Sequence, residues 1–259
     1  MKPPNESRDA IRLYLDEFED QLIGGTDPNP ADYDDLLWEQ TRVRLHKSAL
    51  SMIGKRRMHQ LRTATEIVLG ENVPGDFIEA GVWRGGASIF MRGVLKVHGV
   101  TDRVVWAADS FEGLPAPDAE QFPLEAKVQS GPVMQKLYHN LAAGLEVVKR
   151  NFAAYGLLDD QVKFLKGWFK DTLPTAPTGP LSLIRLDGDF YESTRDGLDS
   201  LYDRLSAGGY VIIDDYGQDS WTYCRKAVDE FRAERHIEDP LIAVDSTCSY
   251  WQRSSLPAL

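Results

Sequence analysis

From residue 76 onward, short apolar runs alternate with segments whose apolar residues recur at helical spacing. This alternation indicates βαβ units around a parallel sheet, and so an α/β fold. A last run, residues 248–253, is predicted to pair as an antiparallel edge strand, which gives about seven strands in all. The other predicted strands are residues 77–80, 104–108, 162–165, 181–186, 210–213 and 241–244, and the predicted helices are residues 87–98, 145–155, 193–205 and 222–235.

We expect a single domain over residues 1–259, because this length suits one large α/β core and the composition is even along it. Residues 1–74 carry helical patterns at 8–22 and 58–69, separated by a turn rich in glycine and proline, and are predicted to form a helical N-terminal cap. The stretch from about residue 115 to 144 contains several prolines and shows no clear period. A long insertion in a compact domain is often functional, so we predict a lid here.

Charge and composition exclude several classes of protein. The net charge of −11 would repel nucleic acid. No window approaches the roughly 20 apolar residues of a membrane span, and residues 1–6 lack the apolar core of a signal peptide, so we expect a cytoplasmic protein without a membrane partner. Cys224 and Cys248 lack the spacing of a disulfide framework or a zinc site and are expected to be reduced, structural thiols.

A glycine-rich turn follows the first predicted strand, at residues 77–86. Glycine lets the backbone approach a ligand closely, and the helix that follows offers free N–H groups at its N-terminus. Such turns also occur without any ligand, and this one matches neither the dinucleotide nor the Walker spacing. Its distinctive feature is Glu79 at the strand end, where a carboxylate could hold the α-amino group of an amino-acid-like cofactor.

The second predicted strand runs into Asp109. In nucleotide-binding sheets an acid at this place accepts hydrogen bonds from ribose hydroxyls. The alternative is that Asp109 only caps the next turn, as Asp often does. Together, Glu79 and Asp109 favour a nucleoside cofactor, because two acids would repel a pyrophosphate but suit a cationic sulfonium nucleoside.

Four acids follow two apolar runs that are predicted to be buried strands: Asp187, Asp189, Asp214 and Asp215. The carboxyl ends of parallel strands meet at one edge of the sheet, where α/β proteins bind ligands. Like charges so close would raise one another's pKa unless a cation neutralised them, and hard oxygen ligands suit Mg²⁺. The alternative is that these acids cap helices and form turns, but the repetition of acid pairs after two strands favours a metal or catalytic site.

Two smaller features leave alternatives open. Gly167-Trp168-Phe169 follows a predicted strand, and Trp168 could lie against a purine ring or pack in the core. The basic run Lys55-Arg56-Arg57 is predicted to be a solvated helix face, with a smaller chance of reaching a cofactor carboxylate. Neither feature decides between functions by itself.

At these motifs the sequence resembles the macrocin O-methyltransferase-like family, whose members methylate sugar hydroxyls of macrolide, aminocoumarin and related antibiotics. The likeness spans nearly the whole chain, from residues 13–16 to residues 250–253. The strings that carry it are residues 75–86, 108–115 and 167–174, Asp187-Gly188-Asp189 and Ile213-Asp214-Asp215-Tyr216.

The resemblance implies a class I methyltransferase fold, a Rossmann-like and mostly parallel sheet with helices on both faces, that binds S-adenosylmethionine and needs a divalent cation, usually Mg²⁺. By matching positions it implies metal ligands at Asp187, Asp214 and Asp215 and a candidate general base at Asp189. The implied cofactor contacts are Glu79, Ala80, Gly81, Val82 and Trp83 on the methionine side, Asp109 and Ser110 at the ribose, Gly167 and Trp168 near the adenine, and Asp187.

The implied reaction is methylation of a deoxysugar hydroxyl in a glycosylated small molecule. Residues 116–144 depart from the family pattern and leave the acceptor open. The alternatives are a catechol-type O-methyltransferase with a similar metal site, an NAD-linked oxidoreductase, which the missing GxGxxG disfavours, and a non-catalytic binding module, in which four unneeded buried acids would be costly. The helical N-terminal extension could also contribute to a homodimer or a higher homo-oligomer.

Overall fold

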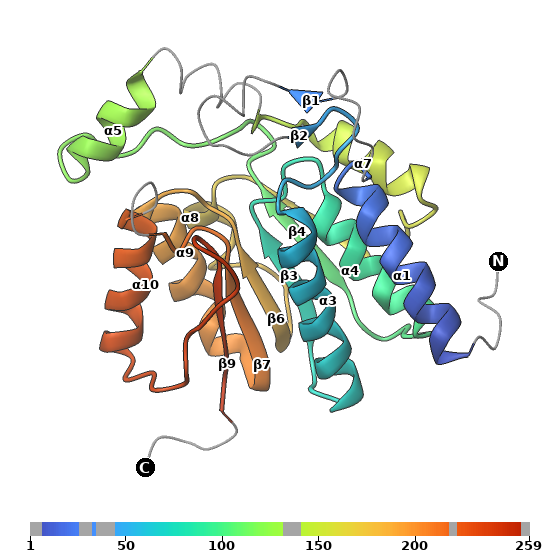
Figure 1. The fold of residues 1–259 in the computed structure, drawn as a ribbon. Helices are drawn as coiled ribbons and strands as arrows, with labels where there is room; N and C mark the ends of the chain where they lie inside the picture. Colours follow the sequence, from blue (N-terminus) through green and yellow to red (C-terminus); the bar gives the residue numbers. More distant parts are fainter. Residues whose placement is uncertain (1–6, 26–32, 35–44, 132–140, 218–221, 255–259) are drawn as a thin grey trace.

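The computed structural model describes residues 7–25, 33–34, 45–131, 141–217 and 222–254, and its centre is a seven-stranded sheet (Figure 1). The order of the strands across the sheet is β5-β4-β3-β6-β7-β9-β8. The α/β sheet expected from the sequence is therefore confirmed. Its strands are β3 (Asp76–Ala80), β4 (Val105–Asp109), β5 (Val162–Lys166), β6 (Leu181–Leu186), β7 (Leu205–Ile213), β8 (Ile242–Ala243) and β9 (Ser249–Gln252).

Strands β3 to β7 run parallel to one another. The chain first places β4 and β5 on one side of β3 and then returns to place β6 and β7 on the other side. The direction of winding therefore reverses between β3 and β6. Open α/β sheets bind their ligands beyond the carboxyl ends of the strands at such a reversal.

The C-terminal hairpin corrects one prediction. Residues 249–252 do form an antiparallel strand, β9, but it lies between β7 and β8 and is not the edge of the sheet. One side of β9 pairs with the end of β7, from Tyr210↔Gln252 to Ile213↔Ser249. Its other side is taken by the two-residue strand β8, which becomes the edge.

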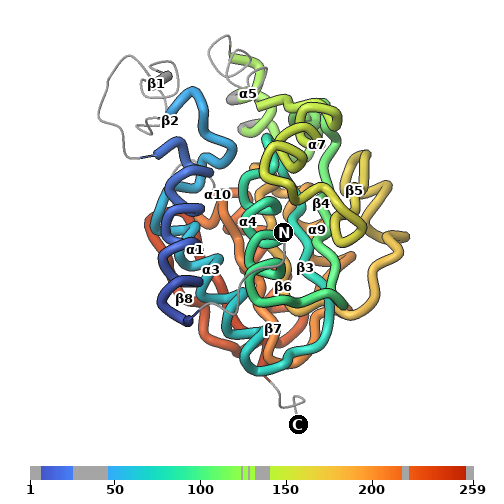
Figure 2. Tube along the Cα trace, turned by 90° about the vertical axis from the view of Figure 1, so that its right-hand side faces the viewer, coloured from blue at the N-terminus to red at the C-terminus, as the bar shows by residue number. Residues whose placement is uncertain are grey.

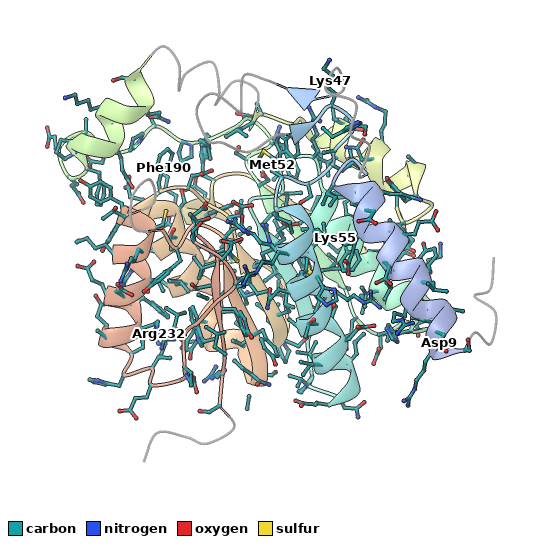
Figure 3. All side chains as sticks on the ribbon, in the orientation of Figure 1. Asp9, Lys47, Met52, Lys55, Phe190 and Arg232 are labelled. Atoms are coloured by element: carbon teal, nitrogen blue, oxygen red, sulfur yellow. The ribbon has the colours of Figure 1, made fainter. Side chains whose placement is uncertain are left out.

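Helices cover both faces of the sheet, as expected, and side chains fill the two spaces between them (Figures 1, 2 and 3). Neighbouring strand residues point to opposite faces, so Phe77 packs in one core and Ile78 in the other. Both are fully buried, and burial of such a side chain contributes about 1.5–3 kcal/mol. One face carries α1 (Arg8–Leu22), α3 (Gly54–Gly70), α4 (Gly86–Val97) and α7 (Leu145–Ala154), and the other carries α8 (Phe169–Thr172), α9 (Tyr191–Leu201) and α10 (Thr222–Glu234).

The predicted helix over residues 193–205 differs from the observed one. It begins two residues earlier and ends at Leu201, where the chain tightens into the 3₁₀ helix η2 (Tyr202–Arg204). Leu205 is already part of β7 and pairs with Leu181, so this strand starts five residues before the predicted one. The register then shifts near Gly208, whose φ of 83° only glycine adopts readily.

The N-terminal segment contains two helices, as expected. α1 matches its prediction, and α3 begins at Gly54, four residues before the predicted start. Arg62 of α3 is buried and lies 2.6 Å from Asp16 of α1, which ties the two helices together. A two-residue antiparallel ladder, β1 (Tyr33–Asp34) with β2 (Leu45–His46), follows α1.

Of the predicted lid, residues 132–140 lie outside the described residues, and residues 123–130 form α5 (Pro123–Ser130). Both α5 and the β1–β2 ladder lie at the end of the molecule to which the parallel strands point (Figures 1 and 2). Within the described ranges, no helix combines the length and apolarity that crossing a membrane requires.

Candidate active site at the carboxyl ends of the strands

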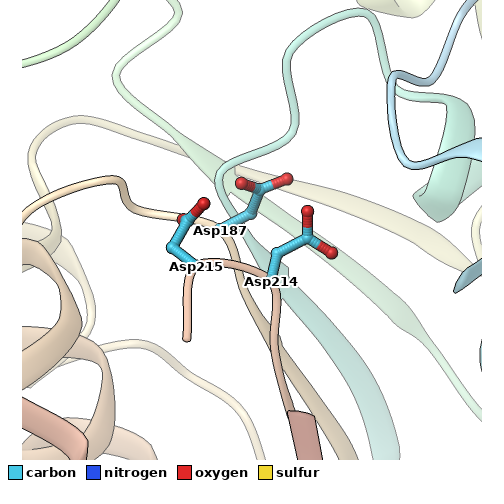
Figure 4. A group of neighbouring side chains, drawn as sticks. All are labelled: Asp187, Asp214 and Asp215. Carbon is cyan, nitrogen blue, oxygen red and sulfur yellow. The ribbon is translucent and has the colours of Figure 1, made fainter. Parts of the chain in front are cut away.

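Three of the four predicted acids meet at the carboxyl edge of the sheet. Asp187 follows β6, and Asp214 and Asp215 follow β7, its parallel neighbour, in which Leu186 pairs with Ile213. This register places both strand ends side by side. One carboxylate oxygen from each of the three acids lies within 4.8 Å of the others (Figure 4).

A buried arginine holds this cluster together from below. Arg185 lies in β6 with a side chain only 2% exposed. Its guanidinium group is 2.6 Å from Glu79, 3.0 Å from Asp187 and 2.7 Å from Asp214. Three carboxylates thus share one cation. Arg185 and Asp214 Oδ1 form an ion pair whose geometry is not that of a hydrogen bond. This buried oxygen can therefore still bind a cation or accept a hydrogen bond.

A second arginine reaches the cluster from the N-terminal cap. Arg57 of α3 donates to Asp214 Oδ2 at 2.7 Å and holds Asp245 through two hydrogen bonds of 2.7 and 2.9 Å. It also donates to Thr247. Because its side chain is only 17% exposed, the prediction of a solvated face is wrong for Arg57. The cap is therefore connected directly to a predicted metal ligand.

Negative charge still exceeds positive charge in the cluster. Five carboxyl groups gather here, from Glu79, the three aspartates and the neighbouring Asp189, against two guanidinium groups, those of Arg57 and Arg185. Arg57 is also shared with Asp245. Burial, and then repulsion from Asp214, raises the pKa of Asp187 to about 8. Burial and repulsion from Asp189 and Asp187 raise the pKa of Asp215 well above its ordinary value. These are the conditions under which carboxylates take a hard divalent cation, and the oxygen set fits Mg²⁺.

The fourth acid, Asp189, occupies a strained turn between this cluster and α9. Its φ of 63° lies in the left-handed region, and its backbone N–H donates to Asp215 at 3.0 Å. Phe190, labelled in the upper left part of Figure 3, then precedes the first residue of α9. Non-glycine residues held in this conformation are concentrated at functional sites.

A cavity of about 300 Å³ opens beside the acid cluster. Five of the predicted cofactor contacts line it: Gly81, Asp109, Ser110, Trp168 and Asp187. The others, Glu79, Ala80, Val82, Trp83 and Gly167, are not part of its wall and stay predictions. The wall is completed by residues that were not predicted as cofactor contacts: Gly113, Leu114, Pro115, Ala116, Phe169, Lys170, Gly188, Glu192, Ser193 and Asp196.

Glu79 is buried, and both of its carboxylate oxygens have protein partners. Oε1 accepts from Arg185 at 2.6 Å, and Oε2 accepts from the hydroxyl of Ser88 on α4. Burial raises the pKa of Glu79, and Arg185 opposes that rise. In this structure Glu79 therefore links β3, β6 and α4 beneath the glycine-rich turn.

Asp109 shapes the glycine-rich turn as well as lining the cavity. Its Oδ2 accepts the backbone N–H groups of Val82 at 2.7 Å and Trp83 at 3.3 Å, and its Oδ1 accepts that of Phe111 at 2.7 Å. The capping alternative is thus present in the structure. Oδ2 already accepts two N–H groups, so a ribose hydroxyl would have to donate to Oδ1, which accepts one N–H group and lies 3.4 Å from the hydroxyl of Ser110; that hydroxyl donates to Gly113 at 2.6 Å.

The turn also touches a predicted metal ligand. Gly81 has a φ of 94°, and a Cβ atom added to it would lie 1.8 Å from the carbonyl oxygen of Asp187. Any side chain at residue 81 would push away the backbone of Asp187, which follows β6. The close approach explains why glycine is needed here.

The charged residues in the wall of the cavity are mostly acidic. The wall carries Asp109, Asp187, Glu192 and Asp196, with Lys170 as its one cationic side chain among the described lining residues. Such a wall attracts a cationic ligand and repels phosphate groups. It matches the sulfonium preference expected from the sequence.

Comparison with known proteins places this site in a family. Residues 30–253 match the model of the macrocin O-methyltransferase (TylF) family. An 8-demethyl-8-(2,3-dimethoxy-α-L-rhamnosyl)-tetracenomycin-C 4'-O-methyltransferase from Streptomyces olivaceus is 52% identical over 212 residues, 81% of this chain and 78% of that protein. The demethyldecarbamoylnovobiocin O-methyltransferase of Streptomyces niveus is 44% identical over 258 residues, 96% of each chain.

Solved structures agree with this placement. The O-methyltransferase NovP matches with a TM-score of 0.83 at 44% identity, covering 94% of this chain and 99% of that chain. The calicheamicin methyltransferase CalS11 matches with a TM-score of 0.60 at 19% identity, covering 95% of this chain and 93% of that chain, which shows a shared fold. The chain therefore belongs to the macrocin O-methyltransferase family and is an O-methyltransferase with the class I methyltransferase fold.

Proposed function

We propose that this enzyme transfers the methyl group of S-adenosylmethionine to a deoxysugar hydroxyl of a glycosylated natural product, with the assistance of Mg²⁺. The observation that carries the proposal is the convergence of Asp187, Asp214 and Asp215 beside a cavity that Asp187 also lines and whose charged residues are mostly acidic. The names of the relatives support the acceptor class, since one is a rhamnosyl-tetracenomycin 4'-O-methyltransferase and another a mycinamicin III 3''-O-methyltransferase, 47% identical over 207 residues.

Asp187, Asp214 and Asp215 would hold the cation through the oxygens that lie within 4.8 Å of one another. When bound, the cation would supply a Lewis acid that lowers the pKa of a neighbouring hydroxyl. Asp189 would take the proton from the acceptor hydroxyl, because it lies on the same rim and its backbone is fixed by Asp215. A rigid rim also orients the acceptor oxygen, which is a large part of the acceleration in such transfers.

The cofactor would occupy the cavity beside these acids. Asp109 and Ser110 would contact the ribose, and Trp168 the adenine ring. The methionine part would lie along residues 79–83 and near Asp187, with Gly167 close to the adenine. The insertion at about residues 115–144, whose first residues already line the cavity, would cover the acceptor and exclude water.

The test is methyl transfer from S-adenosylmethionine with a deuterated methyl group, followed by mass spectrometry. The acceptors are a rhamnosylated polyketide, a noviosylated aminocoumarin, a macrolide with a deoxysugar and a simple catechol, each assayed with Mg²⁺ and after chelation. We expect a mass increase on a deoxysugar acceptor only with Mg²⁺. Transfer to the catechol alone would replace the proposal by the catechol-type alternative, and transfer that survives thorough chelation would contradict the metal role.

An NAD-linked oxidoreductase is disfavoured by the acidic wall of the cavity, which would repel a pyrophosphate. Isothermal titration separates the two ligands directly. S-adenosylhomocysteine should bind, and NAD should not.

A further inference from the structure

The described half of the insertion, residues 115–131, is docked on the first turn of α9. The ring of Phe122 stacks on Tyr191 with centroids 4.8 Å apart and meets Tyr223 of α10 edge-on at 6.1 Å. The backbone N–H of Asp118 donates to Glu192 at 3.2 Å. α9 starts two residues after Asp189, so the insertion rests on the turn that carries the candidate base.

A second polar contact of this docking, made by Glu125, is unusual. Glu125 of α5 is 7% exposed, and one of its oxygens accepts the backbone N–H of Tyr191 at 3.1 Å. Its other oxygen, Oε2, is buried and has no hydrogen-bond partner among the residues that the structure describes. Among the described residues, no lysine or arginine forms an ion pair with this carboxyl group.

The charged and titratable groups around Glu125 do not favour a carboxylate. Glu192 on α9 repels it, and on α10 the nearby titratable group is the buried thiol of Cys224. Lys226 of α10 lies over the ring of Tyr191 and is paired with Glu230 at 3.0 Å. On α5 itself, Lys127 is exposed.

We propose that Glu125 is a pH-sensitive latch: it docks the insertion onto α9 as a neutral carboxylic acid and weakens the docking when it ionises. A neutral acid can accept the Tyr191 N–H while burying only a hydroxyl at Oε2, whereas a carboxylate would be buried with one hydrogen bond and no counterion. Burial, opposed by the Tyr191 bond, raises the pKa of Glu125 to about 7.

The direction in which docking depends on pH follows from the linkage between proton binding and docking. A carboxyl group whose pKa is raised by docking binds its proton more tightly in the docked state, so docking is strongest at low pH and weakens as the pH rises toward the docked pKa. With an ordinary value of 4.5 when undocked and about 7 when docked, the docking constant should fall about tenfold between pH 6 and pH 8.5.

The test is limited trypsin proteolysis of the full chain from pH 6 to pH 8.5. Lys127 is the one trypsin site in residues 115–131. The matched variant is Glu125→Gln, a neutral side chain of the same shape, and the ratio of the two cleavage rates cancels the pH dependence of trypsin itself. Glu120→Gln, an exposed acid in the same segment, is the control.

We expect the ratio of wild-type to Glu125→Gln cleavage at Lys127 to rise about tenfold from pH 6 to pH 8.5, and Glu120→Gln to behave as the wild type. A flat ratio, or faster cleavage of Glu125→Gln at every pH, would overturn the proposal. If trypsin cuts neither protein, the measurement is the hydrogen-exchange rate of the peptide that contains Tyr191. The ratio of the wild-type rate to the Glu125→Gln rate should then rise in the same way from pH 6 to pH 8.5. These probes read the insertion itself, so their outcome does not depend on the proposed function.

Discussion

The contact between Gly81 and Asp187 yields a sharp prediction. In Gly81→Ala the new Cβ would lie 1.8 Å from the Asp187 carbonyl oxygen, whereas an ordinary carbon–oxygen contact is about 3.3 Å. The backbone would have to move by about 1.5 Å. Overpacking of this kind costs about 1–3 kcal/mol, and a left-handed alanine adds about 1–2 kcal/mol. We therefore expect the free energy of unfolding to fall by about 2–5 kcal/mol.

Gly99→Ala is the matched control. Gly99 also has a positive φ, 67°, but an added Cβ would meet nothing within 4 Å. The free energy of unfolding of Gly99→Ala should fall only by about 1–2 kcal/mol, the cost of placing alanine in the left-handed region. Urea denaturation of both variants measures the difference, and Mn²⁺ binding should weaken only in Gly81→Ala, because only this change displaces Asp187. A Gly81→Ala protein as stable as Gly99→Ala would refute the steric argument.

Three further predictions concern the acid cluster. Asp189→Asn should abolish methyl transfer and leave S-adenosylhomocysteine binding, measured by calorimetry, nearly intact; near-normal turnover under saturating Mg²⁺ would contradict its role as the base. Arg57→Met removes the guanidinium partner of Asp245 and one of the two partners of Asp214, which keeps Arg185, and should lower the free energy of unfolding by about 3 kcal/mol, whereas the exposed Arg56→Met should change it little; equal effects would argue against the observed pairing. Because the pKa of Asp187 is raised to about 8, the metal-free protein should lose stability as the pH rises from about 4 to 8. The increase in melting temperature on adding Mg²⁺ should therefore be larger at pH 8.5 than at pH 6.5. An increase that becomes smaller as the pH rises would contradict this linkage.

The parts of the site that the sequence predicts are those fixed by local pattern. Asp187, Asp214 and Asp215 each follow an apolar run, and parallel strands carry such residues to a common edge whatever the loops do. The order of the strands across the sheet was not predicted from the sequence and comes from the structure. Arg185 was missed, although a charged residue in the middle of a buried strand is itself a signal that partners surround it.

Contacts between distant segments were not predictable in this way. Arg57 sits in a basic run that looks solvated, and its partners Asp214 and Asp245 come from the other end of the chain. The position of β9 inside the sheet also depends on long-range pairing with β7, which leaves the two-residue strand β8 as the edge. Glu125 gives no local signal, because its burial arises only when α5 docks on α9.

The central claim, that the acid cluster is a divalent-cation site, is tested most directly by titrating Mn²⁺ into the metal-free enzyme and counting the bound ion by electron paramagnetic resonance. The account predicts one tight site per chain that Mg²⁺ displaces, that is lost in Asp215→Asn, and that is retained in Glu112→Gln, which removes an exposed acid outside the cluster. Binding that is equal in the wild type and Asp215→Asn, or no binding to the wild type, would contradict it.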